Sequence, residues 1–200
     1  AVPDISVLNH IKNNVKAIVI SHAHLDHVGA VPYIADKFDA PVVCGPYTAE
    51  IIRSILKEDR IKLDNEIKTV NIGSRYEVSN NITIEFIHIT HSIPQSALVA
   101  VHTKYGVILY ANDFKLDMHP TLGKKPNFKR MEEISKENVL ALIVESTYSS
   151  DQRKMPSEQV AKEMLRDVLL DTENKDNLII VTTFSSHIAR LKAIIEFGKK

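Results

Sequence analysis

The stretch from His22 to His27 reads HAHLDH and constrains the fold of this chain more than any other feature. It places three histidines and one aspartate within six consecutive positions. Residues 15–20, just before it, form a short apolar run rich in β-branched side chains, which predicts a buried strand. Residues 28–35, just after it, predict the start of a helix that runs to about residue 38. The four polar side chains are therefore expected on a strand-to-helix loop held by a rigid sheet.

The residue types in this stretch are those that bind metals. Zinc takes imidazole nitrogen and carboxylate oxygen, and a catalytic zinc site leaves one position open for water. His22 and His24 are two residues apart and are expected to share one metal. Asp26 and His27 fall on the other side of the turn and are expected to serve a second metal. Surface histidines are the ordinary alternative, but four ligand-type residues at one strand end favour a metal centre.

Two later polar residues also follow predicted strands. His91 ends the strand predicted over 82–87 and precedes a loop that contains proline, so we predict a further metal ligand there. Asp113 ends the strand predicted over 106–111, and a carboxylate at that place can bridge two metals, one oxygen to each. A turn-forming aspartate is the alternative for Asp113. The order of these parts along the chain favours the bridge.

The remaining apolar patterns predict an α/β chain with a boundary between two domains. Further helices are expected over 5–11, 47–57, 128–136, 156–171 and 186–197. Further strands are expected over 41–44, 67–72, 97–102, 139–144 and 178–183. The composition becomes polar at 151–154, and a strand followed by a helix comes after it, as in a parallel α/β unit. We therefore place the boundary near residue 154, giving domains 1–154 and 155–200.

The metal-binding stretch carries a family resemblance. HxHxDH resembles the metal-binding loop of the metallo-β-lactamase fold. HSIPQS (91–96), NDFK (112–115) and EST (145–147) resemble successive motifs of the β-CASP nucleases, most of all the ribonuclease J family and its archaeal members. TTFSS (182–186) is similar to a strand-to-helix turn of the β-CASP domain. The resemblance implies a partial metallo-β-lactamase αββα sandwich followed by the start of a β-CASP α/β domain.

The resemblance also implies roles for individual residues. Two zinc ions would be held by six side chains: His22, His24, Asp26, His27, His91 and Asp113. Asp26 would in addition orient the nucleophile, and Glu145 would tune a histidine supplied from outside this chain. Ser185 and Ser186 are expected to contact the substrate. Manganese remains an alternative metal for these nitrogen and oxygen ligands.

The implied activity is hydrolysis of RNA phosphodiesters by a water activated between two zinc ions. The resemblance implies 5′-to-3′ exonuclease action together with endonuclease cleavage. Three alternatives stay open: another β-CASP nuclease for RNA 3′-end processing or DNA repair, a small-molecule hydrolase of the same fold, and a non-catalytic subunit. The EST motif and the second α/β unit speak against a compact small-molecule hydrolase. The intact ligand set speaks against a subunit that has lost its metals.

Composition limits the setting of the protein. Lysine and arginine together number 25, as do aspartate and glutamate, so the net charge gives no support for nucleic-acid binding, although RNA is the implied partner. Cys44 is the single cysteine, and with no internal disulfide we expect a reducing, cytoplasmic setting. No apolar run reaches membrane-spanning length. The chain begins at Ala1 in mid-pattern, so we expect it to be a fragment of a longer protein. A fragment that carries half of an active site is expected to be weak or inactive alone. For the intact protein a homodimer is one option.

Overall fold

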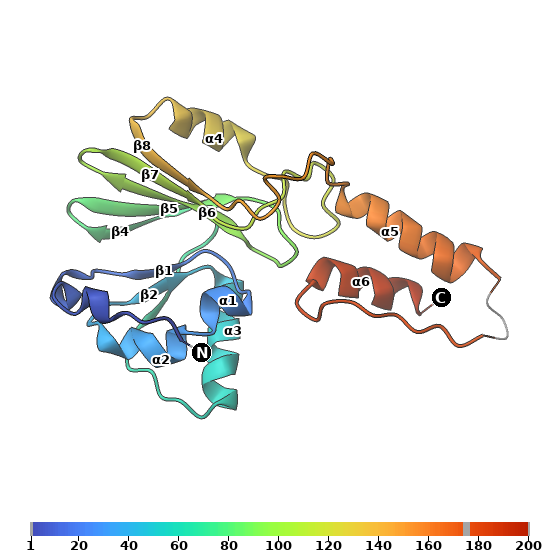
Figure 1. Ribbon diagram of the computed structural model, residues 1–200, viewed down its shortest axis with the longest axis horizontal. Helices are drawn as coiled ribbons and strands as arrows, with labels where there is room; N and C mark the ends of the chain where they lie inside the picture. Colours follow the sequence, from blue (N-terminus) through green and yellow to red (C-terminus); the bar gives the residue numbers. More distant parts are fainter. Residues whose placement is uncertain (1, 174–176, 200) are drawn as a thin grey trace.

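The computed structural model describes residues 2–173 and 177–199 as two facing β-sheets with helices outside them, followed by a pair of helices (Figure 1). The first sheet is parallel and consists of β1 (Ile18–Ile20), β2 (Val42–Cys44) and β3 (Ile67–Thr69). The second sheet has the order β4 (Arg75–Ser79), β5 (Ile82–His88), β6 (Ala97–Thr103), β7 (Gly106–Ala111) and β8 (Val139–Val144). Its neighbours are antiparallel except β7 and β8, which are parallel.

Helices cover the outer faces of both sheets. The apolar sides of α1 (Leu25–Val28), α2 (Val31–Ile34) and α3 (Pro46–Glu58) pack on the first sheet in one core that includes Ile52 and Val42. The helix α4 (Phe128–Ser135) packs on the second sheet through Ile134. A third core, with Val43 on one side and Phe86 on the other, fills the space between the sheets. These layers confirm the predicted αββα sandwich.

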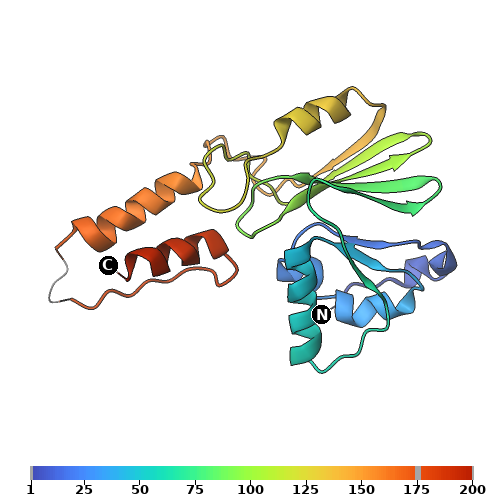
Figure 2. The ribbon, with the colours of Figure 1, turned by 180° about the vertical axis from the view of Figure 1, so that it is seen from behind.

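The last part of the chain is a helix pair. The helix α5 (Glu158–Arg166) continues into a π-helical stretch, Asp167–Asp171, and α6 (Ile188–Phe197) packs against α5. Figures 1 and 2, seen from opposite sides, agree that this pair projects from one end of the sandwich. The strand predicted over 178–183 is wrong for the described residues, because this extended segment has no neighbouring strand to bond to. Its apolar side chains are accordingly exposed, Leu178 to 86%.

Other differences from the predicted elements are local. The expected helix over 5–11 is replaced by two short 3₁₀ turns, Ser6–Leu8 and Lys12–Asn14. The helix expected after the HAHLDH stretch begins inside it, at Leu25, since His24 has the extended backbone of a helix N-cap. The strand β4 was not predicted, although Tyr76 and Val78, which pack on the core between the sheets, alternate with polar residues. None of the helices in the described ranges has the length and hydropathy of a membrane span.

Candidate metal centre

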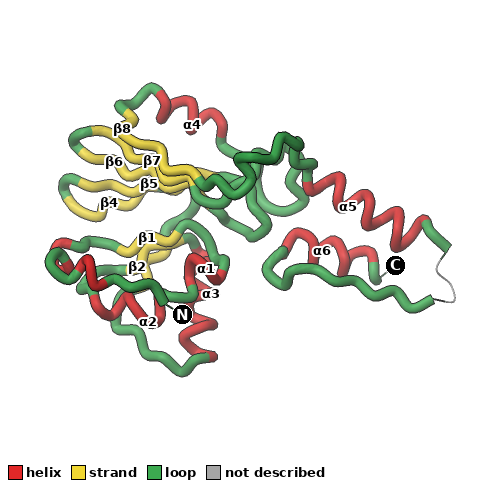
Figure 3. Tube along the Cα trace, in the orientation of Figure 1, coloured by secondary structure: helices red, strands yellow, loops and turns green. Residues whose placement is uncertain are grey.

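The chain brings its ligand-type residues to one edge of the sandwich. His22 and His24 follow β1, His91 follows β5, and Asp113 follows β7. Asp26 and His27 lie in the first turns of α1 rather than on a loop. Figure 3 shows the long loops after β5, β7 and β8 gathered at this end, between the sheets and the α5–α6 pair. Polar side chains placed on loops at strand ends can face a common space while the sheets stay rigid.

Hydrogen bonds between loops fix these strand ends relative to one another. The Ala97 N–H donates to the Ser21 carbonyl at 3.2 Å, which joins the second sheet to the loop after β1. The Asn112 side chain donates to the Ala97 carbonyl at 2.8 Å, which joins β7 to the same point. The Lys115 N–H donates to the Thr90 carbonyl at 2.8 Å, so the residues flanking His91 and Asp113 are also tied together. The edge is therefore rigid before any ligand binds.

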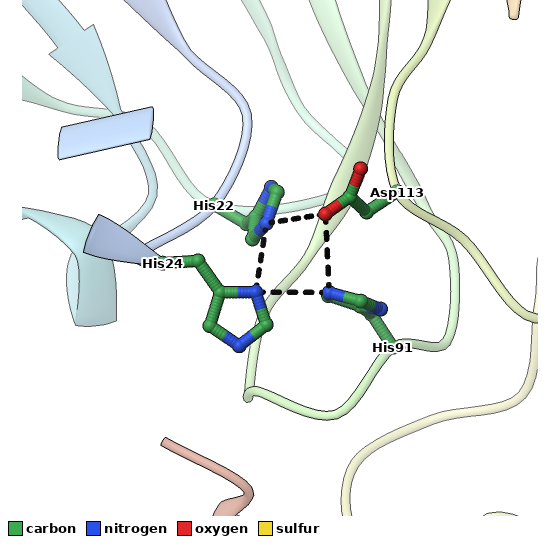
Figure 4. Close-up of side chains that lie close together, drawn as sticks. All are labelled: His22, His24, His91 and Asp113. Atoms are coloured by element: carbon green, nitrogen blue, oxygen red, sulfur yellow. Dashed lines mark hydrogen bonds and ion pairs between the residues drawn. The ribbon is translucent and has the colours of Figure 1, made fainter. Parts of the chain in front are cut away.

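The first group of four residues has the spacing that a single metal ion requires. His24 Nδ1 lies 3.1 Å from His22 Nε2 and 2.9 Å from His91 Nε2. Asp113 Oδ2 lies 3.8 Å from His22 Nε2 and 3.6 Å from His91 Nε2 (Figure 4). A tetrahedral zinc with ordinary bond lengths places its ligand atoms about 3.3 Å apart. The observed distances lie on both sides of that value, so the four side chains fit one ion.

A second group shares Asp113 with the first. His27 Nε2 lies 3.5 Å from Asp26 Oδ2 and 3.6 Å from Asp113 Oδ2. These three ligand atoms can face one ion, with Asp113 common to both groups. The side chain of Asp26 is 76% exposed, whereas His22 in the first group is fully buried. The structure thus assembles the six predicted residues in the two predicted groups, and metal binding by them stays a prediction.

Burial keeps the histidine rings neutral, which is the form that binds metals. Desolvation, followed by the nearby His27 and His91 rings, lowers the pKa of His22 to about 2. Desolvation and then the neighbouring His24 lower the pKa of His91 to about 4, although the Asp113 charge acts in the opposite direction. Desolvation also lowers the pKa of His24. The first group therefore offers nitrogen lone pairs at neutral pH without first losing protons.

Two of these rings have a serine hydroxyl beside the nitrogen that does not belong to the ligand group. Ser21 Oγ lies 3.1 Å from His22 Nδ1, and Ser92 Oγ lies 3.2 Å from His24 Nε2. When the opposite nitrogen of each ring faces a metal, these nitrogens carry the proton and donate it to the serine oxygen. Sequence reasoning did not single out either serine, although Ser21 directly precedes the motif and Ser92 directly follows His91.

A cavity of about 530 Å³ opens beside the metal centre, between the sandwich and the helix pair. His91 and Asp113 line one side of it, and Glu145 and His187 also belong to its lining. Glu145 is partly exposed and accepts a hydrogen bond from the Thr147 backbone N–H at 2.8 Å. Its role in tuning a histidine supplied from outside this chain stays a prediction.

A second, more open cavity borders the HAHLDH stretch. His24 and Asp26 line it together with Ser185, Ser186 and His187. The two serines predicted to contact substrate are thus placed opposite the metal-binding loop. His187 lines both cavities and was missed by sequence reasoning, which stopped at Ser186. The signal that could have found it is a histidine directly after the two serines, in the first turn of the helix predicted over 186–197.

Comparisons with known proteins agree with this geometry. The sequence model of the metallo-beta-lactamase superfamily matches residues 11–145. The chain is 44% identical over 200 residues to a ribonuclease J of Methanocaldococcus jannaschii and 43% identical over 202 residues to one of Pyrococcus abyssi. It is covered completely in both alignments but spans only 45% and 44% of those relatives, about half their length. The resemblance to ribonuclease J inferred from the motifs is confirmed.

A solved structure shares the fold. The crystal structure of a protein of unknown function from Enterococcus faecalis V583 superposes with a TM-score of 0.62 over 92% of this chain and 44% of that one, at 20% identity. The match at this identity supports the fold alone. The assignment of residues 155–200 to a β-CASP domain stays a prediction.

Proposed function

The chain belongs to the metallo-β-lactamase superfamily, and we propose that it forms part of a metal-dependent ribonuclease of the ribonuclease J kind. The observation that carries this proposal is the pair of ligand groups that share Asp113 at the mouth of a cavity. The likeness to ribonucleases J, which covers the whole of this chain and about half of those relatives, supports the substrate class. The same reasoning assigns RNA as the partner and residues near 154 as the boundary between two domains.

The donor set suits zinc. Three imidazoles and a carboxylate in the first group, and one imidazole with two carboxylates in the second, match the ligand preferences of that ion. When bound, two such ions would supply an activated water at neutral pH and neutralise charge on the attacked phosphate. The residues of the chain hold the rings neutral, exclude bulk water around His22, and fix Asp113 between both groups.

The exposed carboxylate of Asp26 is placed for a second task. It lines the open cavity, and its ion-pair partner in the described part of the chain is His27, at 3.5 Å. A carboxylate there can accept a proton from an incoming water and orient it toward a phosphate in the cavity. Glu145 lines the larger cavity, and its backbone N–H donates to the Ala111 carbonyl at 3.2 Å, two residues before Asp113, so its carboxylate can orient a group that enters beside the metals.

The cavity favours a polymer substrate over a small one. Its volume of about 530 Å³ is in the range of ordinary ligand sites, yet it is open and adjoins the second cavity at Ser92 and His187. A continuous path along the metal-binding loop suits a strand that extends past the scissile bond. A small-molecule hydrolase would not need the helix pair that forms the outer wall.

The test uses the full-length protein that contains this chain. We expect zinc-loaded protein to shorten single-stranded RNA from a 5′-monophosphate end, with some internal cleavage. Asp113→Ala should bind less metal and lose this activity, because both ligand groups lose a member. The matched control, His10→Asn, alters an exposed histidine and should behave as wild type. Intact RNA in the presence of two bound metals would refute the assignment, and cleavage of duplex DNA instead would favour a DNA-repair nuclease.

A further inference from the structure

We propose that His187 binds a backbone phosphate of the RNA beside the metal centre through its Nε2–H group. This inference rests on the ribonuclease function proposed above and names a substrate-binding residue within it. His187 lines both cavities, as does Ser92. A strand that passes from one cavity into the other while its phosphate lies at the metals passes these two side chains.

The hydrogen bonds of the ring fix which nitrogen carries the proton. His187 is the N-cap residue of α6, and its Nδ1 accepts a hydrogen bond from the Arg190 backbone N–H at 3.3 Å. An accepting Nδ1 carries no proton, so the proton of the neutral ring is on Nε2. Burial lowers the pKa of His187, in agreement with a neutral ring. Nε2 is therefore the nitrogen of the His187 ring that donates a hydrogen bond.

The donor has room for a ligand. Nε2 lies 3.6 Å from Glu158 Oε2, which is longer than a hydrogen bond. Both oxygens of Glu158 are already engaged by Arg190, at 2.7 and 3.1 Å. The Nε2–H group can thus donate a hydrogen bond to an oxygen of a ligand in the cavity. A phosphate oxygen is the acceptor that an RNA strand offers at every nucleotide.

The other basic side chains of the larger cavity are ion-paired. Arg190 donates two hydrogen bonds to Glu158, and Lys115 Nζ lies 3.7 Å from the buried carboxylate of Asp117. Both keep further N–H groups, so a phosphate that accepts from His187 Nε2 lies in a cavity that two cations also line, which favours an anionic ligand.

The position of His187 is built into the junction of the two parts. Asp117, which is 4% exposed, accepts hydrogen bonds from the Ser157 hydroxyl at 2.6 Å and the Glu158 N–H at 2.8 Å. These bonds fasten the start of α5 to the loop that follows Asp113. Glu158 then holds Arg190 of α6, three residues beyond His187. The ring is thus positioned against the metal side by a chain of buried contacts.

Two substitutions separate a phosphate-binding role from a capping role. Asparagine can place an acceptor near the position of Nδ1 and is a good N-cap, but it does not reach the position of Nε2. Glutamine can place a donor near Nε2 and caps poorly. The experiment measures RNA affinity in the full-length Asp113→Ala background, in which cleavage is expected to be lost, at one zinc concentration for all variants. Steady-state cleavage is measured in the zinc-loaded background with Asp113 intact.

We expect His187→Asn to weaken binding of a short single-stranded RNA by about 10- to 100-fold, the size of a hydrogen bond to a charged group. The loss should appear mainly in KM, and His187→Gln should retain most of the affinity. Equal affinity in wild type and His187→Asn, or better binding by Asn than by Gln, would overturn the inference and leave a capping role. If wild type cleaves no RNA, the ribonuclease assignment fails, whereas a null result for His187→Asn alone leaves it standing.

Discussion

Acidifying the metal-free, full-length protein from about pH 7.5 to about pH 5 is expected to destabilise it through His22. The ring is fully buried, and its pKa in the folded protein is about 2, against 6.5 for an ordinary histidine. Below pH 6.5 the unfolded chain therefore takes up a proton that the folded chain refuses. The free energy of unfolding falls as the pH drops through the window from 6.5 to 2.

The size of the effect follows from the distance below the ordinary pKa. At pH 5 the unfolded ring lies about 1.5 pH units below its pKa, which corresponds to about 2 kcal/mol lost from the free energy of unfolding. His91 acts in the same direction, because its pKa is lowered to about 4. This loss of free energy of unfolding fades above pH 6.5, because the His22 ring is then neutral in both the folded and the unfolded chain.

Urea unfolding of the metal-free protein at the two pH values measures this term. In His22→Asn the difference between the two pH values should shrink by about 2 kcal/mol, whatever the substitution does to stability at neutral pH. The control His10→Asn, at an exposed position, should keep the full difference. An unchanged pH difference in His22→Asn, or NMR signals of the His22 ring that titrate near pH 6.5, would refute the reasoning.

Two further predictions concern the order of metal binding and the charge network behind the second sheet. In a calorimetric zinc titration the first ligand group should fill before the second, because it has four donors and a buried ring, while the second depends on the exposed Asp26. Asp26→Asn should remove the weaker step only, and loss of the tighter step would contradict this. Arg130→Met should lower the free energy of unfolding by about 3 kcal/mol, since it leaves the Glu85 carboxylate buried without its main partner. Lys136→Met, which removes an exposed ion pair with Glu132, should lower the free energy of unfolding by less than about 1 kcal/mol in chemical denaturation. Equal losses in Arg130→Met and Lys136→Met would contradict the burial argument.

The parts predicted correctly from sequence are those whose signal is local. An apolar run ending in a polar residue predicts a strand and the place where its side chains leave the sheet, which is why His91 and Asp113 could be found. The αββα layers follow from the same runs, because each must cover an apolar face. The six ligand residues could be grouped because the sheet edge, once predicted, leaves little freedom in where they go.

The parts that failed depend on partners far along the chain. The segment over 178–183 has the composition of a strand, but a strand forms only where another strand offers hydrogen bonds, and none of the described strands lies beside it. The start of α1 at Leu25 was missed because an N-cap is set by the backbone of one residue, His24. The spacing of apolar residues along a helix does not show at which residue the helix begins.

The same distinction explains why the places of the six ligand-type residues could be predicted while His187 was missed. Every residue of the first ligand group comes from the end of a strand in the sandwich, so its place follows from the strands. His187 owes its place to contacts that run from Asp117 through Glu158 to Arg190, across two helices and a junction. These contacts join residues more than 30 positions apart in the sequence, for which a single sequence offers no periodic signal. Substrate contacts that depend on such a junction can change when the junction moves, while the metal groups stay fixed in the sheets. RNA affinity should therefore be the property most sensitive to substitutions at Asp117 and Glu158.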